Sequence, residues 1–108
     1  MNKASVVKPN ELFFDEDGFL IHPEIWNQQI ARLLARLDGL DELTDDHWQV
    51  IQTLRKYFSD FGAPPMCHHV SIVNHLDKHC VEKLFHTHRE AWRVSGLPNP
   101  GEEAKAYM

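Results

Sequence analysis

The chain has few of the residues that usually indicate a catalytic or metal site. Its 108 residues include two cysteines, Cys67 and Cys80, and five glycines. The cysteines do not form a CxxC pair, which argues against the common zinc-binding spacings. The glycines form no phosphate-binding loop, and no serine lies in the context of a nucleophile elbow. We therefore do not expect an autonomous enzyme.

Positive charge and long apolar runs are also scarce. Lys and Arg number 11 against 16 Asp and Glu, giving a net charge of -5 with neutral histidines. Because phosphate contacts need a cationic surface, nucleic acid is not an expected partner. No run approaches the roughly 18 apolar residues of a membrane span, and the first seven residues lack the apolar length of a signal peptide. We expect a cytoplasmic protein without a membrane partner, in which both thiols are free.

Apolar residues at helical spacing dominate the rest of the chain. With 43% hydrophobic residues, the 108-residue chain can build one compact core but not two domains. The spacing predicts helices over 23–37 and 45–61, the second starting at Thr44 and stopping at Gly62. Three shorter helices are expected after Pro65. They carry Met66, Val70, Val73 and Leu76; then Val81, Leu84 and Phe85 behind Asp77 as a cap; then Ala91, Trp92 and Val94 before Gly96.

The two ends of the chain have different patterns. Asp17-Gly18 lies between two apolar runs and predicts a short β-hairpin. Residues 1–10 show no periodicity and are expected to be a mobile tail. Pro98 and Pro100 disfavour a helix and predict an extended arm. The expected organisation is a tail (1–10), a single domain (11–95) and a C-terminal arm (96–108).

Several stretches, taken in order, resemble the DsrC/TusE family of sulfur-relay proteins, which includes the small subunit associated with dissimilatory sulfite reductase. They are DEDGFL (15–20), Trp26, LTDDHWQVI (43–51), LRKYF (54–58), FGAPPM (61–66), KLF (83–85) and GLPNP (96–100). The resemblance implies a mainly α (α+β) fold, an orthogonal bundle of about five short helices with an N-terminal β-hairpin and a flexible C-terminal arm, in agreement with the periodicities.

The resemblance also implies a sulfur site that this sequence alters. Family members that move sulfur carry a cysteine as the penultimate residue of the arm, because a thiolate is the nucleophile that accepts sulfane sulfur. Reductase-linked members add a second cysteine about ten residues earlier, which can resolve the product as a disulfide. Counted from Gly96, these places fall at Glu103 and Trp92, and neither side chain can carry a persulfide. Basic residues near the family's arm-docking groove align with Cys67, His68 and His69.

The favoured hypothesis is a non-catalytic paralogue that regulates sulfur metabolism by binding a protein of sulfur-relay or sulfite-reductase type. The residues expected to contact that partner are Cys67, His68, His69, Trp92, Arg93, Leu97, Pro98 and Pro100. The alternative retains sulfur transfer, with Cys80 or Cys67 as acceptor, because nearby protonated histidines favour the thiolate. A structural free cysteine is the simpler interpretation of each.

Two further alternatives come from the histidine-rich segment after Pro65. His75 and His79, with Cys80, are candidate metal ligands if a helix places both imidazoles on one face. Asp77 as a helix cap would break that face. The three short helices also resemble a helix-turn-helix DNA-binding module, which the acidic composition disfavours. The sequence predicts no cofactor and leaves the oligomeric state open.

Overall fold

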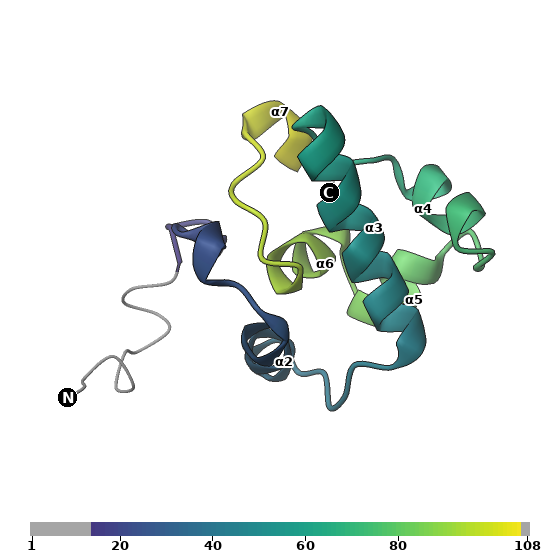
Figure 1. The fold of residues 1–108 in the computed structure, drawn as a ribbon, viewed down its shortest axis with the longest axis horizontal. Coiled ribbons are helices and arrows are strands. Elements are labelled where there is room, and N and C mark those ends of the chain that lie inside the picture. Colours follow the sequence, from purple (N-terminus) through teal and green to yellow (C-terminus); the bar gives the residue numbers. More distant parts are fainter. Residues whose placement is uncertain (1–13, 107–108) are drawn as a thin grey trace.

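The structure, a computed structural model, describes residues 14–106 and is almost entirely helical (Figure 1). Within this range the chain forms a short 3₁₀ helix and six α-helices. They are η2 (Pro23–Ile25), α2 (Gln28–Leu37), α3 (Asp45–Phe61), α4 (Cys67–Val73), α5 (Cys80–Phe85), α6 (His88–Val94) and α7 (Glu102–Lys105). A mainly helical fold is thus confirmed. None of the helices in the described range has the length and apolar character needed to cross a membrane.

The longest helix, α3, has the bounds that the sequence predicts. The Thr44 hydroxyl accepts from the His47 backbone N–H, and the His47 ring accepts from the Thr44 backbone N–H at 3.0 Å. These reciprocal bonds form a capping box with histidine in the place of the usual glutamate. Gly62 ends the helix in the left-handed region, at φ 70°. Strong signals at both ends therefore fix this helix locally.

The predicted helix over 23–37 is wrong in its first part. Pro23 starts only one 3₁₀ turn, and Trp26 then adopts an extended conformation. The Asn27 side chain accepts from the Ile30 backbone N–H at 2.8 Å and begins a separate helix, α2. Asparagine is among the best N-cap residues, so a new start at this position outcompetes continuation from Pro23.

The predicted β-hairpin is also wrong, although its turn is present. In the described range, pairing is limited to one isolated antiparallel bridge between Phe14 and Leu20. Asp15 Oδ1 organises the turn by accepting from the backbone N–H groups of Asp17 and Phe19 at 2.9 and 3.0 Å. Pro23 has no N–H and starts η2, so the second strand has no room to extend. The start of the first predicted strand, residues 11–13, lies outside the described residues.

Three short helices follow Pro65, as predicted, with different boundaries. Helix α4 ends at Val73, so Leu76 lies in the link to α5 rather than on the helix. Asp77 was expected to cap the next helix, but the N-cap of α5 is His79. Asp77 instead accepts from the His79 backbone N–H at 2.7 Å, which stabilises the turn before the helix.

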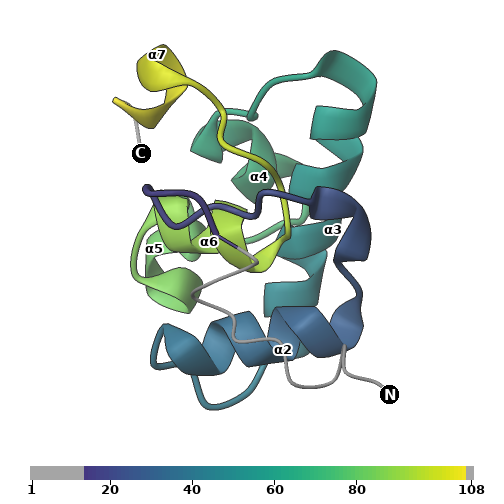
Figure 2. The same cartoon turned by 90° about the vertical axis from the view of Figure 1, so that its left-hand side faces the viewer.

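Helix α6 packs against α2, α3 and α5, whose arrangement Figure 2 shows, and the core lies between these helices. Trp92, Phe19 and Phe85 are its largest fully buried side chains. Phe61, predicted on the apolar face of α3, is instead 67% exposed because it lies at the helix end, beyond the bundle. Residues 97–100 of the arm are outside any helix, but the predicted extended arm then turns into helix α7.

Candidate functional site

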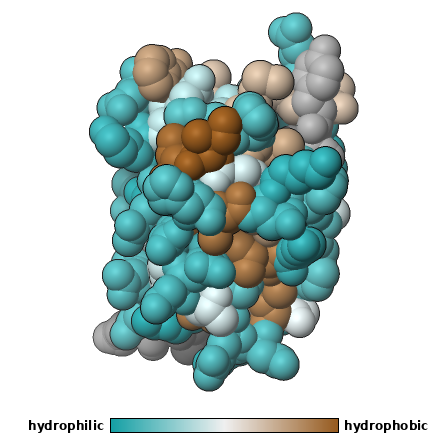
Figure 3. Space-filling view, turned by 90° about the vertical axis from the view of Figure 1, so that its right-hand side faces the viewer, coloured by the Kyte–Doolittle hydropathy of each residue, from teal (hydrophilic) through white to brown (hydrophobic). Residues whose placement is uncertain are grey.

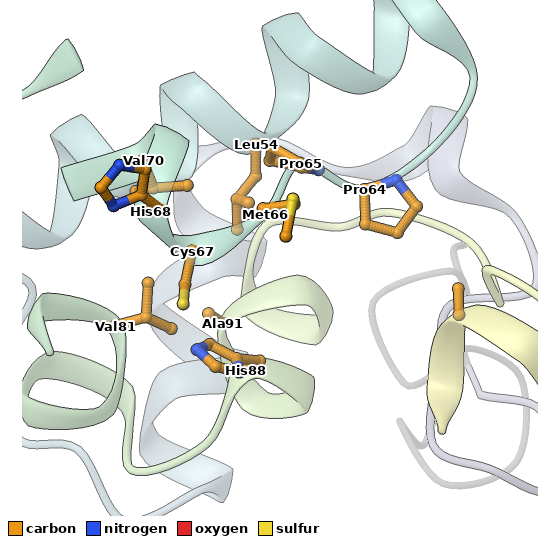
Figure 4. A pocket seen from close by; sticks show the side chains of 11 residues that line it. Leu54, Pro64, Pro65, Met66, Cys67, His68, Val70, Val81, His88 and Ala91 are labelled. Carbon is orange, nitrogen blue, oxygen red and sulfur yellow. The ribbon is translucent and has the colours of Figure 1, made fainter. Parts of the chain in front are cut away.

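A cavity of about 500 Å³ is bounded by α3, α4, α5, α6 and α7. Its wall is mainly apolar, with Leu54 from α3, Val81 from α5 and Ala91 from α6. The arm contributes Ala104 of α7. Helices far apart in the sequence and the C-terminal arm therefore meet at one hollow, shown in Figure 4.

Cys67 brings a thiol to this cavity. The extended Pro64-Pro65 link delivers the chain to α4, and Cys67 is the first residue of that helix. Its side chain points toward Val81 and His88 in Figure 4, and the residue is exposed. An exposed thiol beside a hollow can be reached by another thiol or persulfide.

Cys80 has a different environment. It is 4% exposed and packs in the core. Its Sγ lies 3.5 Å from the Ser71 hydroxyl, and that hydroxyl also donates to the Cys67 carbonyl at 3.0 Å. The hydrogen-bonded burial of Cys80 makes it a structural side chain, out of reach of a reagent on the surface.

The predicted groove residues fall on two sides of α4. His68 lines the cavity with Cys67, and His88 of α6 joins them, although His88 is not among the residues expected at the site. His69 instead lies edge-on to the Tyr57 ring at 5.1 Å and borders a second hollow of about 450 Å³ with Phe61. The structure therefore brings Cys67 and His68 together and separates them from His69.

Exposed apolar residues accompany these hollows. Met66 precedes α4, and Ile72 and Val73 lie at its end, all three exposed. In Figure 3, brown apolar side chains form a broken band between hydrophilic ones.

Trp92 lies at the root of the arm. It is 1% exposed, meets the Phe58 ring edge-to-face at 5.5 Å, and donates from Nε1 to the Pro98 carbonyl at 2.7 Å. Leu97 is also buried, whereas Pro98 and Pro100 are half-buried. Any effect of Trp92 and Leu97 on a partner must therefore act by fixing the arm. Their assignment as partner-binding residues stays a prediction.

A second indole and an arginine fix the same root. Trp26 Nε1 donates to the Val94 carbonyl at 2.9 Å. The Arg55 guanidinium lies over the Trp26 ring at 3.9 Å and donates to the Ser95 carbonyl at 2.7 Å. Burial lowers the pKa of Arg55. The chain is thus bonded to the domain on both sides of Gly96.

Arg93, also expected at the partner surface, forms a largely buried ion pair with Asp38 at the end of α2. It lies over the Phe14 ring at 4.8 Å. Burial raises the pKa of Asp38, and the Arg93 guanidinium opposes that rise. The pair joins α6 to α2 and leaves little of either charge free for a partner.

The tip of the arm contacts the N-terminal turn, a contact that no sequence motif indicates. Lys105 Nζ lies 2.6 Å from Asp17 Oδ2, and Asn99 Nδ2 donates to Asp15 Oδ2 at 3.1 Å and to Asp17 Oδ2 at 3.0 Å. Hydrogen bonds from Lys105 and Asn99 lower the pKa of Asp17, and the bond to Asp17 raises the pKa of Lys105. Glu103, at the position counted for the arm cysteine, is exposed on α7.

The proposed metal ligands do not share a helix face. Helix α4 ends before His75 and α5 begins after His79, and His75 has a positive φ of 55° in the link between them. His79 Nδ1 is 3.2 Å from Glu82 Oε1, and Cys80 points into the core. Among residues 14–106, no group of three or more His, Cys, Asp or Glu side chains is arranged to hold a metal ion. The condition for the alternative metal site, a helix that continues through His75 and His79, is therefore not met.

Comparison with known proteins identifies the fold and the family. The family described as DsrC like protein matches residues 6–102. The chain belongs to the DsrC-like family. A sulfurtransferase TusE homolog of Haemophilus influenzae is 31% identical over 85% of this chain and 92% of its own length. The gamma subunit of dissimilatory-type sulfite reductase from Nitratidesulfovibrio vulgaris is 28% identical over 80% of this chain and 84% of its own length.

Solved structures agree with this assignment. The oxidized gamma subunit of dissimilatory sulfite reductase, DsrC, from Archaeoglobus fulgidus superposes with a TM-score of 0.72 at 32% identity, over 84% of this chain and 90% of that chain. Dissimilatory sulfite reductase I gives 0.73 at 27% identity, over 82% of this chain and 86% of that chain. The DsrC-like fold of this chain is thus shown by both its sequence and its structure.

Proposed function

We propose that this DsrC-like chain is a sulfur carrier whose acceptor thiol is Cys67. The observation that carries the proposal is the position of this thiol: it is exposed and lies at a cavity of about 500 Å³ that the arm helps to line. Relatives named sulfurtransferase TusE supply the class of reaction. In this proposal, Cys67 at the cavity takes the place of the arm cysteine of the sulfur-carrying family members, and the reaction is still sulfur transfer.

The reaction is a transfer of sulfane sulfur between thiols. The Cys67 thiolate attacks the outer sulfur of a donor persulfide. A new S–S bond forms at Cys67 Sγ while the S–S bond of the donor breaks, and the donor leaves as a thiolate. The hydrogen of the outer sulfur moves with it, so Cys67 becomes a persulfide without net oxidation or reduction. Delivery is the same exchange, with the acceptor thiolate attacking the outer sulfur on Cys67.

The cavity suits such an intermediate. A persulfide is one sulfur atom longer than a thiol, and the hollow beside Cys67 has room for it. The wall beside Cys67 is mainly apolar, and the His68 and His88 rings are polar groups that can hydrogen-bond to the outer sulfur. Cys80 lacks this space because it is packed in the core.

The test is intact-protein mass spectrometry after incubation with a persulfide-loaded sulfurtransferase. The wild type and the Cys80→Ala variant should gain the mass of one sulfur atom, whereas Cys67→Ser should gain none. Peptide mapping should locate the added sulfur on Cys67, and reduction should remove it. Circular dichroism of each variant checks that the fold is retained, because Cys80→Ala removes a buried side chain.

Two results would overturn the assignment. Sulfur on the Cys67→Ser variant would place the acceptor at Cys80 or elsewhere. No sulfur on any form, from a donor that loads a cysteine-bearing relative, would end the carrier reading.

A second candidate is the partner-binding protein that carries no sulfur. It is favoured by the arm, where exposed Glu102 and Glu103 lie on α7 and the Trp92 indole fixes the root. In that case, the chain should bind a sulfur-relay or sulfite-reductase protein equally well with Cys67 intact or replaced by serine. The mass measurement and a pull-down with both forms separate the two functions.

A further inference from the structure

The arm of this chain is attached to the domain at two separate places. At its root, the Trp92 indole binds the Pro98 carbonyl. Beyond the root, Asn99, which precedes Gly101, and Lys105, which lies on α7, contact the side chains of Asp15 and Asp17 in the N-terminal turn. We call the four residues Asp15, Asp17, Asn99 and Lys105 the latch.

The acidic half of the latch is preorganised by its own backbone. Asp15 Oδ1 accepts from two backbone N–H groups of the turn, which leaves Oδ2 of the same carboxylate facing Asn99. Asp17 Oδ2 accepts from both Asn99 and Lys105. Two carboxylates therefore converge on the arm without needing to reorient when the arm docks.

The basic half of the latch is a lysine with little exposure. The Lys105 side chain is 9% exposed, compared with 80% for Lys56, which forms an ion pair within α3. Lys105 also contacts Glu102 Oε2 at 3.1 Å, one turn earlier on α7. The stem of Lys105 is thus packed against the protein, and its ammonium group has two carboxylate neighbours.

Helix α7 depends on the latch for its position. It has four residues, and its single apolar side chain is that of Ala104, so it lacks the apolar face that normally holds a helix to a core. Gly101 precedes it with φ 102°, in open space, and its N–H donates to Asn99 Oδ1 at 2.9 Å. The residue thus lies where the anchored root ends and α7 begins, in a conformation that glycine adopts easily.

We propose that the latch holds α7 as a movable wall of the Cys67 cavity, and that breaking the latch swings α7 about Gly101 and opens the cavity to a partner. The link between the two is Ala104, which lies next to Lys105 and lines the cavity. The role of the latch in sulfur transfer rests on the proposed function, but its control of the arm does not. Asp17, the acidic partner of Lys105, is 37% exposed, and ion pairs that solvent reaches weaken as salt rises, so ionic strength is one signal that releases the arm.

The experiment measures arm mobility and thiol access in the full chain. Asp17→Asn keeps the shape of the side chain and an oxygen for Asn99, but removes the charge that Lys105 binds. Lys105→Gln removes the other partner. Hydrogen exchange of the amides in residues 102–106 should be about two- to fivefold faster in both variants than in the wild type. Labelling of Cys67 by a bulky maleimide should also be faster in both variants. Labelling by iodoacetamide should change less, because this reagent is smaller.

A matched control is available on α3. Asp60→Asn removes the same charge from an ion pair with Lys56 that includes no arm residue. Its exchange and labelling rates should equal those of the wild type. The exchanged pair Asp17→Lys with Lys105→Asp should restore slow exchange, which a purely local effect on the turn would not do. High salt should bring the wild type close to Asp17→Asn.

If the amides of residues 102–106 exchange equally fast in the wild type, Asp17→Asn and Lys105→Gln, the proposal that the latch holds α7 is refuted. Faster hydrogen exchange without faster maleimide labelling would show that α7 does not limit access to the cavity. It would refute the proposal that the latch controls access to Cys67. Failure of the proposed function gives a different pattern: the arm would open in Asp17→Asn while Cys67 still gains no sulfur from the loaded donor.

Discussion

Gly96 is the position where a single methyl group should loosen the arm from the domain. The residue has φ +75°, in the region that L side chains rarely adopt. A Cβ added there would lie 2.0 Å from Trp26 Cδ1, 2.2 Å from Cγ and 2.7 Å from Cβ. These are atoms of the ring and its attachment point, not the end of a flexible chain. In Gly96→Ala, the Trp26 side chain must therefore leave its place.

The cost has three sources. Alanine in the left-handed region costs about 1 to 2 kcal/mol. Displacing Trp26 removes its hydrogen bond to the Val94 carbonyl, a loss of about 1 kcal/mol. It also removes the stacking of Arg55 on the indole, worth about 0.5 to 1 kcal/mol. We expect Gly96→Ala to lower the free energy of unfolding by about 3 kcal/mol.

Gly62→Ala is the control, because Gly62 has a similar φ of +70° but nothing within 4 Å of the added Cβ. It should lose only the backbone contribution, about 1 to 2 kcal/mol. Urea unfolding of the wild type and both variants measures the difference. If Gly96→Ala were no less stable than Gly62→Ala, the close packing of Trp26 on the arm root would be refuted.

Three other predictions concern the packing and charges of the domain. His47→Ala removes a buried ring that is hydrogen-bonded to the N-cap of α3 and to a carbonyl of α5, so it should lower the free energy of unfolding in urea by about 2 kcal/mol. His22→Ala, at an exposed histidine, should change the free energy of unfolding very little, and equal losses in the two variants would contradict the prediction. Asp38→Asn leaves Arg93 without its carboxylate and should cost about 3 kcal/mol, so an unchanged midpoint would mean the pair is unimportant. The His79 backbone N–H, with Lys83, lowers the pKa of Asp77, so its stabilising effect is complete above the ordinary value of 3.8 and is lost as the pH falls through the lowered pKa. Unfolding curves of the wild type and Asp77→Asn should therefore converge at acid pH, and a constant gap would refute the assignment.

The sequence predicts elements whose signals are local. Helix α3 is correct at both ends because Thr44 and Gly62 act within one turn of the residues they cap. Helix α2 begins later than predicted because Asn27 is a cap signal that the apolar spacing of 23–37 conceals. The short helix α7 also had a signal, since Glu102 and Glu103 favour the first turn of a helix, but the preceding prolines suggested an extended arm.

The prediction of a β-hairpin around Gly18 was wrong for a different reason. A turn is decided by a few neighbouring residues, and the turn around Gly18 is present with φ 90°. A strand needs a partner along its whole length, and pairing in the described residues stops at the bridge between Phe14 and Leu20. Neighbouring segments, not the turn, decide whether such a bridge extends.

The candidate site was predicted in part. The family resemblance selects Cys67, His68 and His69 as counterparts of residues near the arm-docking groove, and the first two lie at the cavity. His88 was not selected for the site, although it reaches the same cavity from another helix. The contact of Lys105 with Asp17 spans 88 positions, and no periodicity relates residues at that distance. Such contacts follow from the packed fold and have no local pattern.

The position of the thiol decides which partner must move in a sulfur transfer. A thiol at the end of an arm can be carried into the active site of a donor. With the acceptor at Cys67, the thiol stays on α4, and the donor persulfide must reach the cavity on a projecting segment of its own. On the proposed function, the arm needs a firm root and a releasable end, because it would cover or uncover the cavity. The buried Trp92 indole and the exposed charges around Lys105 match these two requirements, which an arm that carries sulfur outward would not share.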